Sequence, residues 1–202
     1  QDPHAEKLSN IALPISQPYF AKIVLDFKRG AGPKELYIGA AGVSDDSCRR
    51  LVVDWRSPVA EVYYNQDMGP THYRANGRTI AVDLTLRRQF DIVRDELRAY
   101  FDTNIAIQDS LLLASLSKQR TSQMQAITAT IQKEQNAVIR HEDSPVLLVA
   151  GIAGSGKTSV LLQRIAYLFY QHRENLRPED VFLITSEPVV RHYIADVLPD
   201  RG

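Results

Sequence analysis

The sequence has little of several features that define protein classes. Among its 202 residues there is one cysteine, Cys48, so the chain cannot form an internal disulfide. No stretch approaches the roughly 18 consecutive apolar residues that a membrane-spanning helix needs. Net charge is also absent, because 24 Lys and Arg residues balance 24 Asp and Glu residues and leave no global field to attract nucleic acid. These absences predict a soluble cytoplasmic protein in a reducing compartment, without membrane contact.

The two ends of the sequence lack processing signals. The first residues, QDPHAEKLSN, contain neither an initiator Met nor the basic and apolar regions of a signal peptide. The last residues, DVLPDRG, directly follow a predicted helix. We therefore expect a part of a longer protein, in which residues 1–17 form a tail or linker after a missing N-terminal region.

Metal-ligand spacing is missing too. The five histidines are scattered, so no metal site made of side chains alone is expected. The only Trp lies in DWRSP, where Asp54 and Arg56 are two residues apart and are predicted to form a structural ion pair. The basic residues of LRRQ and RDELR lie among acidic ones, which is typical of a solvated face.

Short alternating segments fill the first half of the chain. YFAKIVLDF, KELYIGAAG, LVVDW, VAEVYY and THYRANGRTIAV are rich in Val, Ile and Tyr and are separated by turn residues, which predicts antiparallel strands. Asn76 and Gly77 suit the positive φ angles of a tight primed turn. We expect a small β-rich module over residues 18–95.

The second half changes its period. The segment from residue 83 to 104 alternates at first and then has helical spacing, so a strand is expected first and its second half is left open. Helices are predicted at SLLLASLSK and QAITATIQKEQNAVIRH, the latter with Ile127, Ile131, Val138 and Ile139 on its buried face. PVLLVAG and VFLITS read as neighbouring parallel strands, with helices KTSVLLQRIAYLFYQ and PVVRHYIADVL after them. This order predicts the start of a doubly wound α/β domain.

A phosphate-binding motif joins the first parallel strand to its helix. Gly151, Gly154, Gly156, Lys157 and Thr158 fit G-x-x-x-x-G-K-[ST]. Glycines let the backbone approach a phosphate, and the helix N-terminus points positive partial charge at it. Lys157 is expected to reach the β and γ phosphates, and the Thr158 hydroxyl to bind Mg²⁺. Arg164 and Tyr167, on the following helix, are expected to pack and cap.

Gln135 stands upstream of this loop. Its amide donates and accepts at once, which matches the N6 and N7 edge of adenine. A Gln ahead of AGSGKT, followed by VLLQRIAYL, resembles the opening of a superfamily-one helicase motor of the UvrD and Rep type. PYFAKIVLDF, LYIGAAGVSDD, VVDWRSPVAEVYY, DLTLRRQFDI, TIQKEQNAVIR and YIADVLPDRG resemble, in order, the HelD proteins, helicase-IV-like ATPases that bind bacterial RNA polymerase.

The resemblance implies a domain plan and a ligand set. Residues 96–202 would be the N-terminal part of a RecA-like motor domain, with a coiled-coil arm before residue 1 and the remaining motor domains after residue 202. ATP and Mg²⁺ would be the cofactors, bacterial RNA polymerase a partner, and DNA a further partner of the complete protein. The implied ATP-binding residues are Gln135, Gly151, Ala153, Gly154, Ser155, Gly156, Lys157, Thr158 and Ser159, of which Lys157 and Thr158 would be catalytic.

The sequence departs from the family pattern at two places. Ser159 stands where UvrD-like motors usually have Arg, and ITSEPVV lacks the Thr-Asn-Lys-Ala run that contacts single-stranded DNA. No apolar strand ending in Asp-Glu follows Thr158, although Glu187 is a candidate carboxylate, and no arginine finger is evident. The chain is therefore expected to bind ATP without hydrolysing it, within a parent protein that does. The alternative is a partner-binding module built on a P-loop scaffold.

Overall fold

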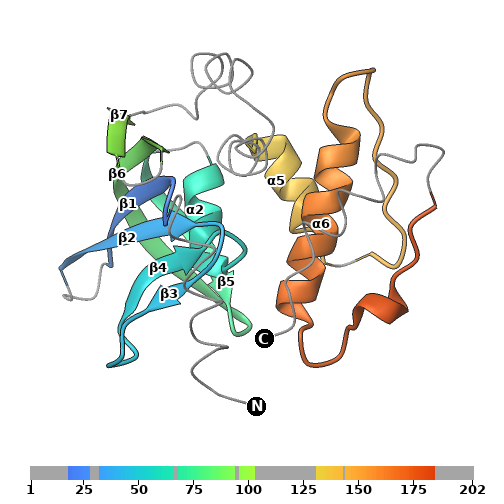
Figure 1. Cartoon of the computed structure of the whole chain (residues 1–202), viewed down its shortest axis with the longest axis horizontal. Helices are drawn as coiled ribbons and strands as arrows, with labels where there is room; N and C mark the ends of the chain where they lie inside the picture. Colours follow the sequence, from blue (N-terminus) through green and yellow to red (C-terminus); the bar gives the residue numbers. More distant parts are fainter. Residues whose placement is uncertain are drawn as a thin grey trace. The chain divides into compact units, whose positions relative to one another are not determined.

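The computed structural model describes residues 18–27, 32–65, 68–93, 96–102, 131–142 and 144–184. The chain divides into two compact units, Gln1–Lys133 and Glu134–Gly202. Among the described residues, the first unit is built on one mixed sheet of seven strands with a short helical segment, and the second contains α6 (Lys157–Gln171) and all of α5 (Lys133–Ile139) except its first residue (Figure 1).

The sheet has the strand order β3-β4-β2-β1-β6-β5, and β7 also pairs with β6. Among the strands that the structure describes, only β2 and β4 run parallel, so the predicted antiparallel module is observed with one parallel pair. The strands are β1 Ala21–Asp26, β2 Pro33–Gly39, β3 Val43–Ser44, β4 Arg50–Asp54, β5 Gly69–Ala75, β6 Arg78–Val93 and β7 Glu96–Asp102.

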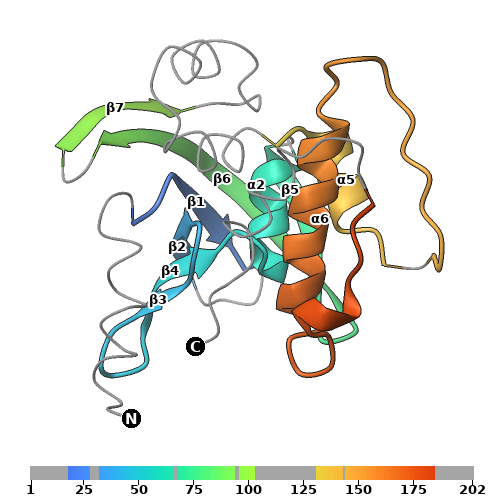
Figure 2. The same ribbon diagram turned by 45° about the vertical axis from the view of Figure 1, so that its right-hand side comes forward.

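The tight turn predicted at Asn76 and Gly77 is confirmed. Ala75 of β5 pairs with Arg78 of β6, and the two residues between them have φ of 51° and 70°. These positive angles match the twist of the flanking strands and fix their register. β6 then continues as one long strand to a second hairpin with β7, and both strands are drawn in green in Figure 2.

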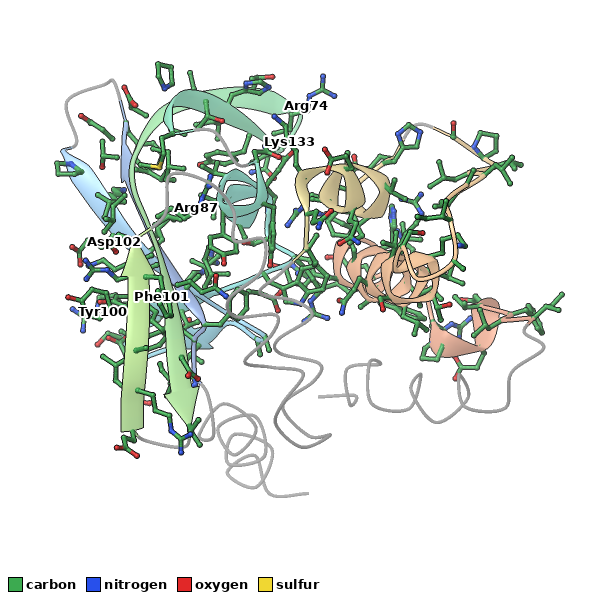
Figure 3. All side chains as sticks on the ribbon, turned by 90° about the horizontal axis from the view of Figure 1, so that it is seen from above. Arg74, Arg87, Tyr100, Phe101, Asp102 and Lys133 are labelled. Carbon is green, nitrogen blue, oxygen red and sulfur yellow. The ribbon has the colours of Figure 1, made fainter. Side chains whose placement is uncertain are left out.

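The second hairpin resolves the segment that the sequence left open. Residues 83–93 belong to β6, and residues 96–102 form β7 rather than a helix. The sheet thus extends past the predicted boundary at residue 95. Tyr100, Phe101 and Asp102 of β7 are labelled in Figure 3, and Tyr100 lies under the Arg88 guanidinium, whose carbon is 4.4 Å from the ring centroid.

The strand predicted at VAEVYY is wrong. Residues Pro58–Ala60 form a 3-10 turn, η1, and Glu61–Tyr64 form the helix α2. Pro58 favours this start, because its fixed φ suits a first helical position and its missing N–H is not needed there. Val62, Tyr63 and Tyr64 are all buried, and consecutive burial of this kind does not fit the alternation of a strand.

The core of this unit lies between α2 and one face of the sheet. β1 and β6 supply Ile23, Leu25, Val82 and Leu84, each 1% exposed or less. The Phe20 and Tyr63 rings meet edge to face with centroids 6.0 Å apart. Burial raises the pKa of Tyr63, and the charge of Arg87 opposes that rise. On the sheet, Arg87 is itself a buried residue of β6 (Figure 3).

The second unit contains α5 Lys133–Ile139 from its second residue on, α6 Lys157–Gln171 and a 3-10 turn, η2 Pro178–Asp180. α5 and α6 lie side by side in both ribbon views (Figures 1 and 2). Of the face predicted for α5, Ile139 is buried, as is Ile131 just ahead of the helix, whereas Val138 is only half-buried. Ile127 and the helices predicted at SLLLASLSK and PVVRHYIADVL lie outside the described residues.

The two parallel strands predicted around the phosphate loop are not observed. Residues 146–150 and 181–184 are neither helical nor paired as strands. Val146, Leu148, Phe182 and Ile184 are 81%, 89%, 89% and 96% exposed. A parallel strand is stabilised by neighbouring strands and by layers on both faces, and within the described part of the chain these apolar side chains have no such cover. The P-loop sheet therefore stays a prediction.

Candidate nucleotide-binding site

Residues 151–156 form a turn that leads into the N-terminus of α6. Gly154 and Gly156 have φ of +79° and +82°, a region that L side chains rarely adopt. A Cβ at Gly151 would lie 2.6 Å from Ser155 Oγ, so a side chain there would require the exposed serine to rotate away. The Val160 amide then donates to the Gly156 carbonyl at 2.9 Å and starts the helical hydrogen-bond pattern.

The Lys157 side chain folds back over this turn. Its ammonium donates to the carbonyl oxygens of Gly151 at 2.9 Å and of Ile152 at 2.7 Å. The positive charge is therefore held at the concave side of the loop by two backbone acceptors. Because an ammonium is a compact point charge with three donors, the same position suits a bound anion.

The other predicted site residues are located on the same two elements. Thr158 is exposed in the first turn of α6, and Ser159 next to it is half-buried. Ala153 and Ser155 are exposed in the loop. The structure thus brings the nine predicted ligand residues to one loop, one helix start and one neighbouring helix.

Gln135 approaches the loop from α5. Its side-chain Nε2 donates to the Ser155 carbonyl oxygen across 3.4 Å, which is a long hydrogen bond. A Cβ built at Gly156 would lie 3.1 Å from the same Nε2. The amide predicted to read adenine therefore touches the backbone predicted to hold the phosphates.

Arg164 and Tyr167 cap and pack, as predicted. Arg164 Nη1 donates to the carbonyl oxygens of Val138 and Ile139, and the Tyr167 hydroxyl donates to Glu142 Oε1. Burial raises the pKa of Tyr167 to about 12, with the nearby Arg140 charge opposing the rise. Helical spacing predicts which face these residues share but not their acceptors, since those belong to another segment.

A cleft of about 830 Å³ lies along the same helix. Lys157 and Thr158 line one part of it, and Leu147, Val149 and Leu161 line another. Gln135 does not line it, so this cleft includes two residues of the predicted phosphate site but not the predicted adenine position. Part of its apolar lining, Leu147 and Val149, comes from the segment in which a parallel strand was predicted, and Leu161 comes from α6.

Within the described ranges, no three His, Cys, Asp or Glu side chains gather as metal ligands would. None of the described helices combines the length and hydropathy that crossing a bilayer requires. Glu187, the candidate carboxylate for hydrolysis, lies outside the described residues.

Comparison with known proteins assigns the two halves of the chain to helicases. Residues 131–187 match the UvrD/REP helicase N-terminal domain, which covers α5, the phosphate loop and α6. Residues 1–116, more than half of the chain, match the N-terminal domain of DNA helicase IV HelD. The chain belongs to the HelD family of helicases.

Curated relatives match mainly the second half. The chain is 40% identical over 62 residues to the ATP-dependent DNA helicase PcrA of Staphylococcus epidermidis, which is 31% of this chain and 8% of that protein. It is 49% identical over 47 residues to the ATP-dependent DNA helicase UvrD1 of Mycobacterium leprae, 23% of this chain and 6% of that protein. A probable DNA helicase II homolog of Rickettsia conorii is 38% identical over 63 residues, 31% of this chain and 9% of that protein. The matched region thus spans less than a tenth of each relative.

Proposed function

We propose that this chain supplies the ATP-binding loop of a HelD-type superfamily-one motor. The observation that carries the proposal is the glycine-dependent turn that ends at the N-terminus of α6 with Lys157 folded over it. The family assignment and the names of the curated relatives, which are ATP-dependent helicases, support the choice of ATP.

The residues present fit a nucleoside triphosphate. The turn depends on the positive φ of Gly154 and Gly156, and a Cβ at Gly154 would meet nothing within 4 Å, so this part of the loop is open to a phosphate. Lys157 would exchange its two carbonyl acceptors for phosphate oxygens, and Gln135 would hydrogen-bond the adenine edge. Ala153, Gly154, Ser155 and Ser159 would contribute backbone contacts or a hydroxyl.

Mg²⁺ would be held by the Thr158 hydroxyl together with phosphate oxygens. When bound, it neutralises the charge that develops on the phosphates. This chain offers Thr158 but no hydrophobic segment ending in Asp-Glu after it, and no arginine finger. We infer that the 202-residue chain binds ATP without turnover and that the complete protein hydrolyses ATP.

The experiment separates binding from turnover. ATP binding is titrated by calorimetry for the parent chain and for Lys157→Ala, and phosphate release is followed for both and for the full-length protein with and without Mg²⁺. Weaker binding by Lys157→Ala, no turnover by the chain and Mg²⁺-dependent turnover by the full-length protein are the expected results. Equal affinity of parent and variant would contradict the proposed site.

The domain plan and partners complete this proposal. Residues 18–95 would form the β-rich module, and residues 96–202 the first part of a RecA-like domain. By family likeness, the complete motor would remodel or recycle bacterial RNA polymerase complexes and would contact DNA. Stimulation of full-length ATPase activity by RNA polymerase, by DNA or by both would identify which partner couples to the motor.

A partner-binding module is the second candidate. The observation in its favour is β7, on which Leu97, Tyr100 and Phe101 are 54%, 55% and 39% exposed. In the register with β6, Leu97 and Tyr100 lie on one face of the strand and Phe101 on the other, and large exposed apolar side chains on one face are typical of protein interfaces. If the full-length protein shows no turnover even with RNA polymerase or DNA, this reading replaces the motor.

A further inference from the structure

α6 holds the C-terminal end of α5 through one arginine. Arg164 Nη1 donates to the carbonyl oxygen of Val138 at 2.9 Å and to that of Ile139 at 3.1 Å. The last carbonyl oxygens of a helix accept no hydrogen bond within the helix. A cationic donor at this end supplies those hydrogen bonds and interacts favourably with the helix dipole. The Arg164 side chain therefore holds α5 through backbone carbonyls of α5, and this contact does not depend on which side chains α5 has.

Tyr167, one turn further along α6, adds a second anchor. Its ring lies 5.1 Å from the Arg140 guanidinium carbon, and its hydroxyl donates to Glu142 Oε1 at 2.9 Å. Arg140 in turn donates from Nε to Asn136 Oδ1 at 2.9 Å, and Asn136 is 1% exposed. Residues three apart on a helix share a face, so both anchors act on the same end of α5.

The anchored end is one turn from Gln135. Ile139 is four positions after Gln135, which corresponds to about 6 Å of helix rise. α5 spans only Lys133–Ile139, and a helix of this length is not stable without tertiary contacts. The position of the Gln135 amide beside Ser155 and Gly156 therefore depends on what fixes α5 against α6.

We propose that Arg164 is a positioning residue that sets the base selectivity of the nucleotide site. It touches neither the loop nor the predicted ligand, and it acts by holding α5 so that the Gln135 amide faces the base beside the phosphate loop. This inference rests on the proposed ATP-binding function. Without the Arg164 contacts, α5 is held on α6 by the Tyr167 contacts, so Gln135 samples more positions and its hydrogen bonds to adenine offset less of the ordering that they require.

The test measures base selection separately from phosphate binding. The chain and its variants are titrated with ATP, with GTP and with tripolyphosphate, which has no base. Arg164→Ala should lower the ATP to GTP affinity ratio about tenfold, in line with what one bidentate base contact contributes. Its affinity for tripolyphosphate should stay within about twofold, because a lost base contact leaves the phosphate loop intact.

Four further variants sharpen the result. Gln135→Ala should lower the ATP to GTP affinity ratio as much as Arg164→Ala does. The double variant should lower this ratio no further, because both substitutions remove the same contact between Gln135 and adenine. Arg164→Lys should keep part of the selectivity, since one nitrogen, Nη1, serves both carbonyls and an ammonium with three donors can replace it, although on a shorter side chain. Arg173→Ala is the control, because that arginine follows α6 and lies over Tyr170, 5.6 Å from its ring centroid, rather than on α5.

The outcomes separate the two proposals. An unchanged ATP to GTP ratio in Arg164→Ala, or a parallel loss of tripolyphosphate affinity, would overturn the positioning role alone. Additive effects of Gln135→Ala and Arg164→Ala would overturn it as well. If the parent chain binds neither ATP nor tripolyphosphate, the proposed function fails and the positioning role fails with it.

Discussion

Arg56 and Asp54 form a two-point ion pair at the end of β4. Arg56 Nε donates to Asp54 Oδ1 at 2.9 Å and Nη2 donates to Oδ2 at 2.7 Å, while the Arg56 amide donates to Oδ1 at 2.8 Å. Their side chains are 13% and 8% exposed. Since β4 ends at Asp54 and η1 begins at Pro58, the pair fixes the turn that leads from the sheet to α2.

Breaking this pair should destabilise the first unit. Arg56→Ala leaves the Asp54 carboxylate buried without its fork of donors, and removing one partner of a buried pair costs about 3 kcal/mol. Urea unfolding curves of parent and variant measure the free energy. Arg49→Ala is the matched control, because its ion pair with Asp45 has an arginine side chain that is 78% exposed. An Arg56→Ala protein as stable as that control would contradict the structural role.

Gly39 is a second fixed point of the sheet. A Cβ there would overlap the Pro18 carbonyl oxygen and lie 2.8 Å from Val52 Cγ1. Gly39→Ala should therefore lower the free energy of unfolding by about 1–3 kcal/mol, as overpacking of a tight site does. Gly42→Ala, three residues on, meets nothing closer than 3.8 Å and should be neutral or slightly stabilising. Thermal melts that show equal effects would rule out the steric argument.

Local signals in the sequence predicted much of this unit. The Asn76–Gly77 turn and the Asp54–Arg56 pair were both readable, because each depends on residues a few positions apart. The helix α2 was missed because VAEVYY has the composition of a strand. Its helical conformation depends on the burial of its side chains against the sheet, which the local sequence does not show. The β7 strand was ambiguous, since its second-half spacing fits a helix until β6 pairs with it.

The glycine turn before α6 was predictable for a different reason, whereas its role in binding phosphate stays a prediction. Gly151, Gly156 and Lys157 follow from the geometry that a phosphate demands, which is the same in any surrounding fold. The two strands predicted around that loop are not observed. A parallel strand forms only beside non-local partner strands, and a local apolar pattern cannot show whether those partners are in place. The acceptors of Arg164 could not be predicted either, since they are backbone carbonyls of a separate helix.

Asp102 should make the stability of the β6–β7 hairpin depend on pH. The hydrogen bonds from Arg88, and then its charge, hold the pKa of Asp102 below its usual value of 3.8. A carboxyl with a lowered folded pKa stabilises the fold above its unfolded pKa, and this contribution is lost as the pH falls through the folded pKa. The stability advantage of the parent over Asp102→Asn should therefore be present at neutral pH and vanish in acid.

Urea unfolding from pH 7 to pH 2 checks this difference, with Glu96→Gln on the same strand as the control. The gap between parent and Asp102→Asn should also shrink in high salt, because both side chains of the pair are partly exposed. A gap that stays constant over the whole pH range would show that the Asp102 charge has no role in it.

Substitutions at Gly156 and Gly154 test whether the loop and the Gln135 amide, which is proposed to bind the base, are coupled. Both residues have positive φ, so alanine at either position strains the turn by about 1 kcal/mol. Only at Gly156 would the new Cβ meet the Gln135 amide, at 3.1 Å, whereas a Cβ at Gly154 has nothing within 4 Å. Both variants should bind tripolyphosphate more weakly, but only Gly156→Ala should also lose preference for ATP over GTP. Calorimetric titrations of the two variants with the three ligands decide the matter, and equal ATP to GTP ratios would mean that Gln135 acts independently of the loop.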